Sequence, residues 1–318
     1  MINKNLYTKE LKRNRKNLIT WSLIVVGFTF LIVAIFPSMA EMGEDITKLM
    51  EKLPKELSKG LGVDAQTWSS IIGFYGTYYG IYIILLVGIF TASTGATIIS
   101  KEEKEGTSEF LMTKPISRKT IFMTKMMSLV TLTLIIYFIQ SITAILGFVL
   151  FSEGKVDWTT FFIMHTHGLF LILFFTCTGV LLSMFFKPKK NFMGMVVGII
   201  FGSYFLDAMS KAASSVEWIG YISPFHYLKI ATDDPNYAVN YFGIIAITTI
   251  GFLLSTNVLF DKSIPNSELP FNILFSIVKP SFIYVPLIPM PLPALLTITF
   301  FLIILESLPI KIPLPPLL

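Results

Sequence analysis

The most charged stretch of the sequence lies at residues 101–119, between two long apolar runs, and reads KEEKEGTSEFLMTKPISRK. It contains no His, no Cys and no glycine-rich loop that could hold a phosphate, so no active site is visible in it. Its Glu and Lys side chains surround the apolar residues Phe110, Leu111 and Met112. Apolar side chains on a charged surface are suited to binding another protein. The stretch is therefore a candidate docking surface.

Local patterns divide this stretch into a loop between two helices. Gly106 is expected to end the first helix, and Thr107 can cap a short helix over residues 108–112. Pro115 keeps the chain extended, and Ser117 is placed to cap the next long helix. The short helix would present Phe110 beside Glu109. The alternative is a solvated charged loop that only joins the two helices.

Few side chains within the apolar runs could do chemistry. His165 and His167 are two residues apart, so on a helix they point to different sides and would not chelate a metal together. Asp207 precedes Lys211 by four residues and is expected to face that lysine or water. Cys177 lies among aromatic residues and is interpreted as a small buried hydrophobic residue. We predict no metal site, no cofactor and no catalytic residue.

The composition places these residues in a membrane protein. The 318-residue chain is 53% hydrophobic and only 14% charged, a balance that is not typical of soluble domains. Its net charge of +5 is interpreted as a topology signal and not as a surface for nucleic acid. We therefore predict an all-α, polytopic protein that is surrounded by the lipid bilayer and binds no nucleic acid.

Six apolar runs have about the length needed to cross a bilayer core. They lie at residues 18–36, 71–99, 126–151, 158–186, 192–209 and 237–260. Residues 1–17 are basic and loosely amphipathic, which predicts a helix at the membrane interface, with a disordered basic tail as the alternative. Residues 18–262 then form a six-helix domain that contains the charged loop at 100–119.

The charges of the loops alternate along the chain. Segments 1–17, 101–119 and 187–190 are rich in Lys and Arg, and six alternating spans place all three on one side. Loops 41–69, 152–157 and 211–236 are balanced or acidic and fall on the other side. By the positive-inside rule, the N-terminus is expected to be cytoplasmic in a multi-pass protein of the cell membrane.

Two further features concern packing. Gly194, Gly198 and Gly202 recur every four residues in the fifth run, which allows another helix to approach closely, either within the chain or in a second subunit. Residues 263–318 are rich in proline, and their one proline-free helical run, 294–305, is too short to span a bilayer. We expect this tail to lie outside the six-helix fold, in a loosely packed or interfacial state.

The charged loop carries a resemblance to a known family. The run Glu102-Glu103-Lys104-Glu105-Gly106-Thr107-Ser108-Glu109, followed by Thr113-Lys114-Pro115-Ile116-Ser117-Arg118, resembles the cytosolic loop of type-2 ATP-binding-cassette (ABC) exporter permeases. The family pattern, E-x-E-K-G-T-x-E-x-L-L-x-T-P-x-S-R, follows its second membrane helix. This chain departs from it by one extra residue, Glu105. The segment Ile222-Ser223-Pro224-Phe225-His226-Tyr227 is also similar to one that precedes the last span in these permeases.

The resemblance implies a permease subunit that forms the translocation pathway of an ATP-driven exporter and is not itself an enzyme. It implies an elbow helix at 1–17 and a second permease subunit, identical or paralogous, for which Gly194, Gly198 and Gly202 are the favoured contact. It also implies that the loop forms a coupling helix that docks on a separate ATPase subunit. The coupling residues would be Glu102, Glu103, Gly106, Thr107, Glu109, Phe110, Pro115, Ser117 and Arg118.

Two other classes of protein remain as alternatives. An ion-coupled carrier or a channel-like protein would need charges within its spans, and these are scarce. A membrane-bound enzyme acting on lipid head groups would need clustered His or carboxylate residues, and here they are scattered. Because the sequence lacks a Walker phosphate-binding motif, ATP-driven transport would require a partner that binds the nucleotide.

Overall fold

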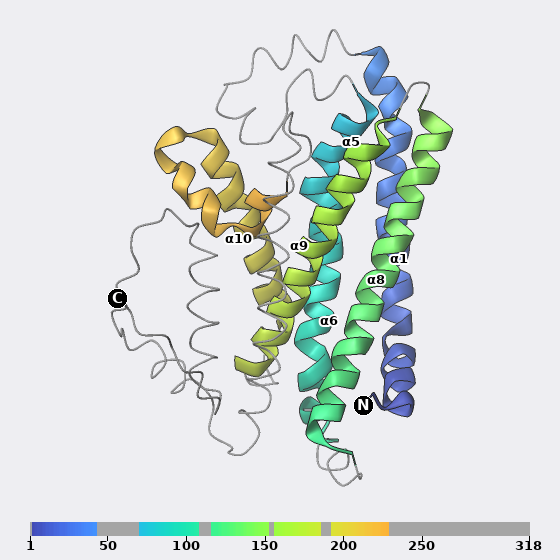
Figure 1. Cartoon of the computed structure of the whole chain (residues 1–318), viewed down its shortest axis with the longest axis vertical. Helices are drawn as coiled ribbons and strands as arrows, with labels where there is room; N and C mark the ends of the chain where they lie inside the picture. Colours follow the sequence, from blue (N-terminus) through green and yellow to red (C-terminus); the bar gives the residue numbers. More distant parts are fainter. Residues whose placement is uncertain (1, 43–69, 108–115, 153–155, 186–191, 229–318) are drawn as a thin grey trace, which may run out of the picture.

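The computed structural model describes residues 2–42, 70–107, 116–152, 156–185 and 192–228, and all regular secondary structure in these ranges is helical. Figure 1 shows long helices that run side by side along the longest axis of the molecule. The predicted all-α class is confirmed for this part of the chain. The predicted sixth span, 237–260, and the tail, 263–318, lie outside the described residues.

Within the described ranges, five helical stretches are long and apolar enough to cross a membrane. They correspond to the first five predicted runs. The helices are α1 (Lys4–Glu41), α5 (Ile71–Tyr78) continued by the π-helical turn η1 (Tyr79–Ile83) and by α6 (Ile84–Lys104), α8 (Arg118–Phe151), α9 (Trp158–Phe185) and α10 (Phe192–Ala212). Two short 3-10 helices, η2 (Ser214–Ile222) and η3 (Pro224–Tyr227), follow α10.

The first helix corrects one prediction. A separate elbow helix was expected over residues 1–17, before a span at 18–36, but α1 is a single helix of 38 residues that covers both. Residues 4–17 contain no Gly or Pro that would interrupt a helix. The helix also continues through Pro37, where the span was expected to end. This proline lies in the last turns of α1, where the loss of one backbone hydrogen bond has only a local effect.

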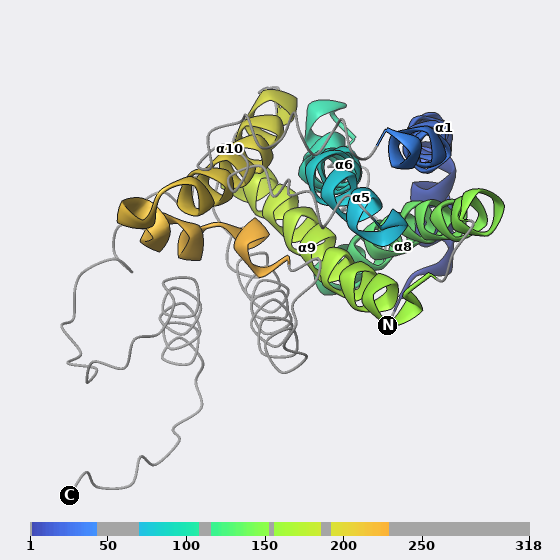
Figure 2. The same ribbon diagram turned by 90° about the horizontal axis from the view of Figure 1, so that it is seen from above.

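Helix α1 is held against α8 along its length (Figures 1 and 2). At its start, the backbone N–H of Asn3 donates to Thr124 Oγ1 at 3.0 Å, and the hydroxyl groups of Tyr7 and Thr131 lie 2.9 Å apart. Farther along, a Cβ added to Gly147 would lie 3.0 Å from the side chain of Val33, so the two helices pack closely there as well. These contacts make α1 and α8 a closely packed pair.

Helices α6 and α9 form a second closely packed pair, beside which α10 lies (Figure 2). A Cβ added to Gly179 of α9 would lie 2.0 Å from the backbone oxygen of Ala92, and one added to Gly95 would lie 2.7 Å from that of Thr176. Only glycine permits such a close approach of two helix backbones. The core between the helices is apolar and aromatic, with Tyr75, Phe90 and Phe175 fully buried.

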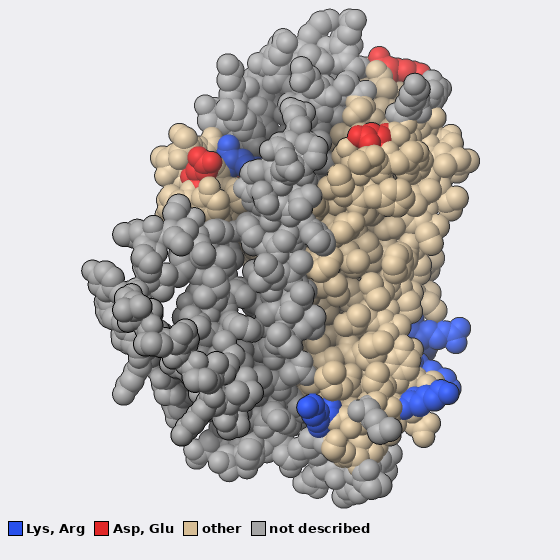
Figure 3. All heavy atoms as spheres, in the orientation of Figure 1, with Lys and Arg blue, Asp and Glu red and all other residues tan. Residues whose placement is uncertain are grey.

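The outer surface of the bundle is apolar along its length and charged at its ends. Leu23, Val149 and Phe205 are each more than 60% exposed, as expected for side chains that face lipid. On the face shown in Figure 3, Lys and Arg gather at the end that carries the N-terminus and the start of α8, which we call the basic end. Asp and Glu appear at the opposite end, which we call the acidic end.

Candidate functional site

The charged loop predicted as a docking surface leaves α6 and enters α8 at the basic end of the bundle. Helix α6 ends at Lys104, and Gly106 has a φ of 67°, a left-handed conformation that favours glycine. Two backbone hydrogen bonds close the helix end, from Glu105 N to Lys101 O at 2.9 Å and from Thr107 N to Glu102 O at 2.8 Å. The predicted stop at Gly106 is confirmed.

The far side of the loop also begins as predicted. The side chain of Ser117 accepts a hydrogen bond from the backbone N–H of Thr120 at 3.2 Å and caps α8. Glu103 lies in α6, and Arg118 is the first residue of α8. Residues 108–115 lie outside the described ranges, so the short helix at 108–112 remains a prediction, as do the roles of Glu109, Phe110 and Pro115.

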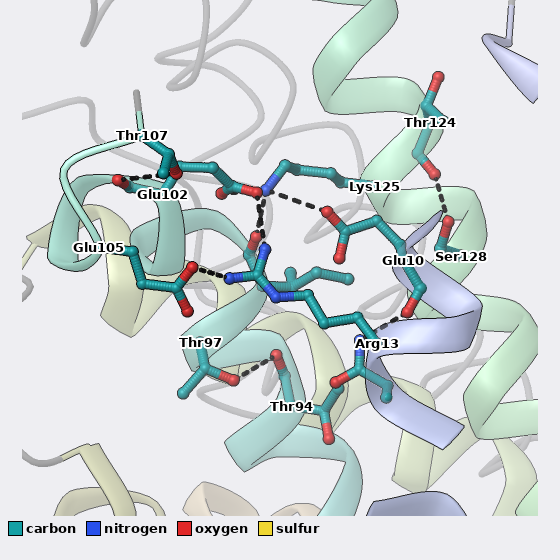
Figure 4. A network of polar contacts seen from close by, with 12 residues as sticks. Glu10, Arg13, Thr94, Thr97, Glu102, Glu105, Thr107, Thr124, Lys125 and Ser128 are labelled. Carbon is teal, nitrogen blue, oxygen red and sulfur yellow. Dashed lines mark hydrogen bonds and ion pairs between the residues drawn. The ribbon is translucent and has the colours of Figure 1, made fainter. Parts of the chain in front are cut away.

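Next to the two ends of the loop, four charged side chains from three helices and that of Glu105, which follows α6, meet in what we call the ion cluster: Glu10, Arg13, Glu102, Glu105 and Lys125 (Figure 4). Lys125 of α8 is only 3% exposed. Its Nζ forms an ion pair with Glu102 of α6, lies 3.6 Å from Glu10 Oε1 of α1, and donates to the backbone oxygen of Ile98 at 2.5 Å. One ammonium group therefore connects α1, α6 and α8.

Arg13 forms the outer part of the ion cluster. Its guanidinium lies 3.4 Å from Glu102 Oε1 and forms a second ion pair with Glu105, the residue before Gly106. The hydrogen bond from Arg13 holds the pKa of the exposed Glu105 carboxyl below its ordinary value. Arg13 therefore connects α1 to the last residues before the loop.

An apolar layer lies next to the ion cluster and limits access of water to it. Ile98, Phe122, Met126 and Leu129 are buried together there. A buried charge without a partner costs several kcal/mol, and Lys125 and Glu10 can therefore lie here only as members of a paired group. Glu10, Arg13 and Lys125 were not predicted from the sequence as site residues. Lys125 lies at the edge of an apolar run, where a charge needs a partner, and this position could have indicated a buried ion pair.

A second polar group lies within the bundle, between α5, α8 and α9. The Tyr75 hydroxyl accepts from Gln140 Nε2 at 2.7 Å and lies 3.3 Å from His165 Nε2. The Tyr79 and Tyr137 hydroxyls lie 2.9 Å apart, and Tyr137 also donates to the backbone oxygen of His165. These contacts join the helices through hydrogen bonds inside an otherwise aromatic core.

The two histidines behave as separate groups. His165 stacks among aromatic rings, with the Phe161 ring centre 3.9 Å away, while His167 Nδ1 lies 2.8 Å from the backbone oxygen of Ile163. In the part of the chain that is described, no group of three or more His, Cys, Asp or Glu residues is placed to hold a metal ion. Cys177 is buried, as predicted.

At the acidic end, Asp207 meets the predicted partner. Lys211 Nζ lies 2.6 Å from Asp207 Oδ2, and His226 Nδ1 lies 3.6 Å from Oδ1. Asp207 is buried and does not face water. The nearby hydroxyl of Ser223 donates to the backbone oxygen of Ser203 at 2.6 Å, which fastens the Ser-Pro-Phe segment to α10.

The glycine stripe of α10 is open. Among the described residues, a Cβ added to Gly194, Gly198 or Gly202 would meet no atom of a neighbouring element within 4 Å, and all three residues are exposed. This differs from Gly95 and Gly179, which lie against another backbone. The role of the stripe as a subunit contact stays a prediction.

Apolar helices long enough to span a bilayer, with charges gathered at the two ends, define a multi-pass helical membrane protein. The chain belongs to the ABC-2 family transporter proteins, whose family model matches residues 4–263. It is thus the membrane permease of an ABC transporter and not its catalytic subunit, as the resemblance of the charged loop had implied. No curated protein and no solved structure matched the chain.

Proposed function

We propose that this permease forms the translocation pathway of an exporter and is driven by a separate ATPase subunit that docks on the loop 101–119. The observation that carries the proposal is the ion cluster, which connects the end of α6 and the start of α8, the two stems of this loop, to α1. The loop leaves the bundle at the basic end, which the positive-inside rule assigns to the cytoplasm, where ATP is available. The N-terminus lies at the same end and is cytoplasmic in this proposal.

The docking test replaces Glu109 and Phe110 together with alanine. If Phe110 is buried against the ATPase, its loss removes about 1.5–3 kcal/mol of binding free energy, which is about tenfold or more in affinity. We expect normal membrane insertion, weaker copurification of the ATPase subunit, and loss of the ATP hydrolysis that the permease stimulates.

A matched control exists at the other end of the bundle. Glu217 and Trp218 are also an adjacent acid and aromatic residue, both are exposed, and they lie in η2 at the acidic end. Their double alanine variant should bind the ATPase subunit like the wild type. Undiminished binding and stimulation after substitution of Glu109 and Phe110 would contradict docking at this loop.

The proposal also includes a second permease subunit, identical or paralogous, that contacts the open glycine stripe of α10. Replacing Gly198 with leucine should separate the subunits in detergent, because a large side chain would block the approach of a second helix. Gly27 on α1 also has no atom within 4 Å of an added Cβ, so Gly27→Leu is the matched control. Size-exclusion chromatography with light scattering measures the oligomeric state of each variant. Loss of the dimer with Gly27→Leu alone would place the contact on α1 instead.

A further inference from the structure

The ion cluster joins α6 and α8, the two helices that flank the loop, to α1, which is distant from them in sequence. Glu102 lies at the start of loop 101–119, in the last turn of α6, Lys125 lies on α8, which follows the loop, and Glu10 lies on α1. The Lys125 ammonium donates hydrogen bonds to Glu102 and to the backbone oxygen of Ile98, and it lies 3.6 Å from Glu10 Oε1, which is the distance of an ion pair. This side chain is therefore hydrogen-bonded to α6 and ion-paired with α1.

Arg13 adds a second connection one turn farther along α1. It reaches Glu102 and Glu105, so the last turn of α6 before Gly106 is held from the same face of α1 that carries Glu10. Apolar contacts tolerate sliding of one helix along another, whereas paired charges with fixed donors favour one register. The cluster thus constrains the angle at which the two stems of the loop emerge.

We infer that Glu10, Arg13 and Lys125 are positioning residues that hold the stems of loop 101–119 in the orientation bound by the ATPase subunit. This inference rests on the proposed function and adds the residues of α1 and α8 that prepare the docking surface. None of the three is part of the loop tip. They act through Glu102 and Glu105, whose backbone leads into it.

The main test compares Arg13→Gln with Arg15→Gln in the full-length permease, reconstituted in lipid nanodiscs. Both variants remove one guanidinium from α1, but Arg15 is exposed and forms no ion pair in the described structure, whereas Arg13 connects to α6. Spin labels at Lys104→Cys and Lys119→Cys, two exposed positions on the two stems, report the distance between the stems in a Cys177→Ala background. Binding of the ATPase subunit that copurifies with the wild type is measured on unlabelled protein.

We expect a narrow distance distribution for the wild type and for Arg15→Gln, and a broadened one for Arg13→Gln. The affinity for the ATPase subunit should fall about threefold for Arg13→Gln and stay within about twofold for Arg15→Gln. Lys125→Met removes the central cation and should broaden the distribution further, with about a tenfold loss of affinity. If Lys125→Met does not fold, the comparison of Arg13→Gln with Arg15→Gln tests the inference by itself.

Unchanged distances and unchanged affinity in folded Arg13→Gln would overturn the inference, as would an equal loss in Arg15→Gln, which would indicate a general effect of charge. The distance measurement needs no ATPase subunit. If the wild-type permease binds no such subunit, the proposed function fails, and with it the docking role. In that case the distances still show whether the cluster orders the stems.

Discussion

Two glycines of the described helices, Gly95 and Gly179, lie against the backbone of another helix, and the space for a Cβ is smaller at Gly179. The Cβ of Gly179→Ala would lie 2.0 Å from the backbone oxygen of Ala92, so α9 and α6 would have to separate. We expect this substitution to destabilise the protein by about 1–3 kcal/mol, the range for overpacked cores. Thermal unfolding in detergent would show a lower Tm, while Gly27→Ala, with open space around its Cβ, should leave the Tm unchanged. Equal values for both variants would contradict the close packing of these helices.

At the scale of single residues, roles that depend on neighbouring residues can be predicted from the sequence, whereas contacts between residues far apart in the chain cannot. Gly106 and Ser117 were identified because a helix stop and a helix cap depend on neighbouring residues and backbone hydrogen bonds. The partnership of Glu10 with Lys125 could not be predicted in this way, because more than a hundred residues separate them and only the packing of α1 on α8 brings them together.

At the scale of the elements, the π-helical turn η1 has a polar contact to the neighbouring helix α8. Tyr79, its first residue, is fully buried, and its hydroxyl is paired with that of Tyr137 on α8. Tyr137→Phe would leave the Tyr79 hydroxyl without this partner, which is expected to cost about 1 kcal/mol. The variant should unfold at a lower temperature in detergent. Tyr82→Phe is the control, since Tyr82 lies in the same turn but is 43% exposed. No difference between the two variants would argue against a stabilising role for the pair.

The five spans in the described residues were predictable because polar residues flank each long apolar run. The type of helix within a span was not predictable. Nothing in residues 71–99 indicates that α5 and α6 are joined by a π-helical turn, in which Tyr79 lies against Gly168 of α9. The unbroken α1 was also missed, because its amphipathic first half and apolar second half look like two elements in the sequence.

At the scale of the whole molecule, the boundary of the transport fold can be tested. The family model ends at residue 263, one residue after the charged pair Asp261 and Lys262, and the proline-rich tail follows. We propose that 263–318 is dispensable for the fold. A chain that stops after Lys262 should insert into the membrane, keep the oligomeric state of the full chain and bind the ATPase subunit with the same affinity. Loss of assembly in this truncated chain would show that the tail is structural.

The continuous first helix has a mechanical consequence. At about 1.5 Å per residue, α1 rises about 57 Å, almost twice the roughly 30 Å of a bilayer core. Only its first turns are fastened to α6 by charge, and from Arg13 to Glu41 the helix extends a further 42 Å or about eight turns. A rotation of about 5° at Arg13 would therefore displace the far end by about 4 Å. In the proposed complex, α1 and the α8 helix packed along it would carry a small tilt beside the loop to the opposite membrane surface as a larger displacement.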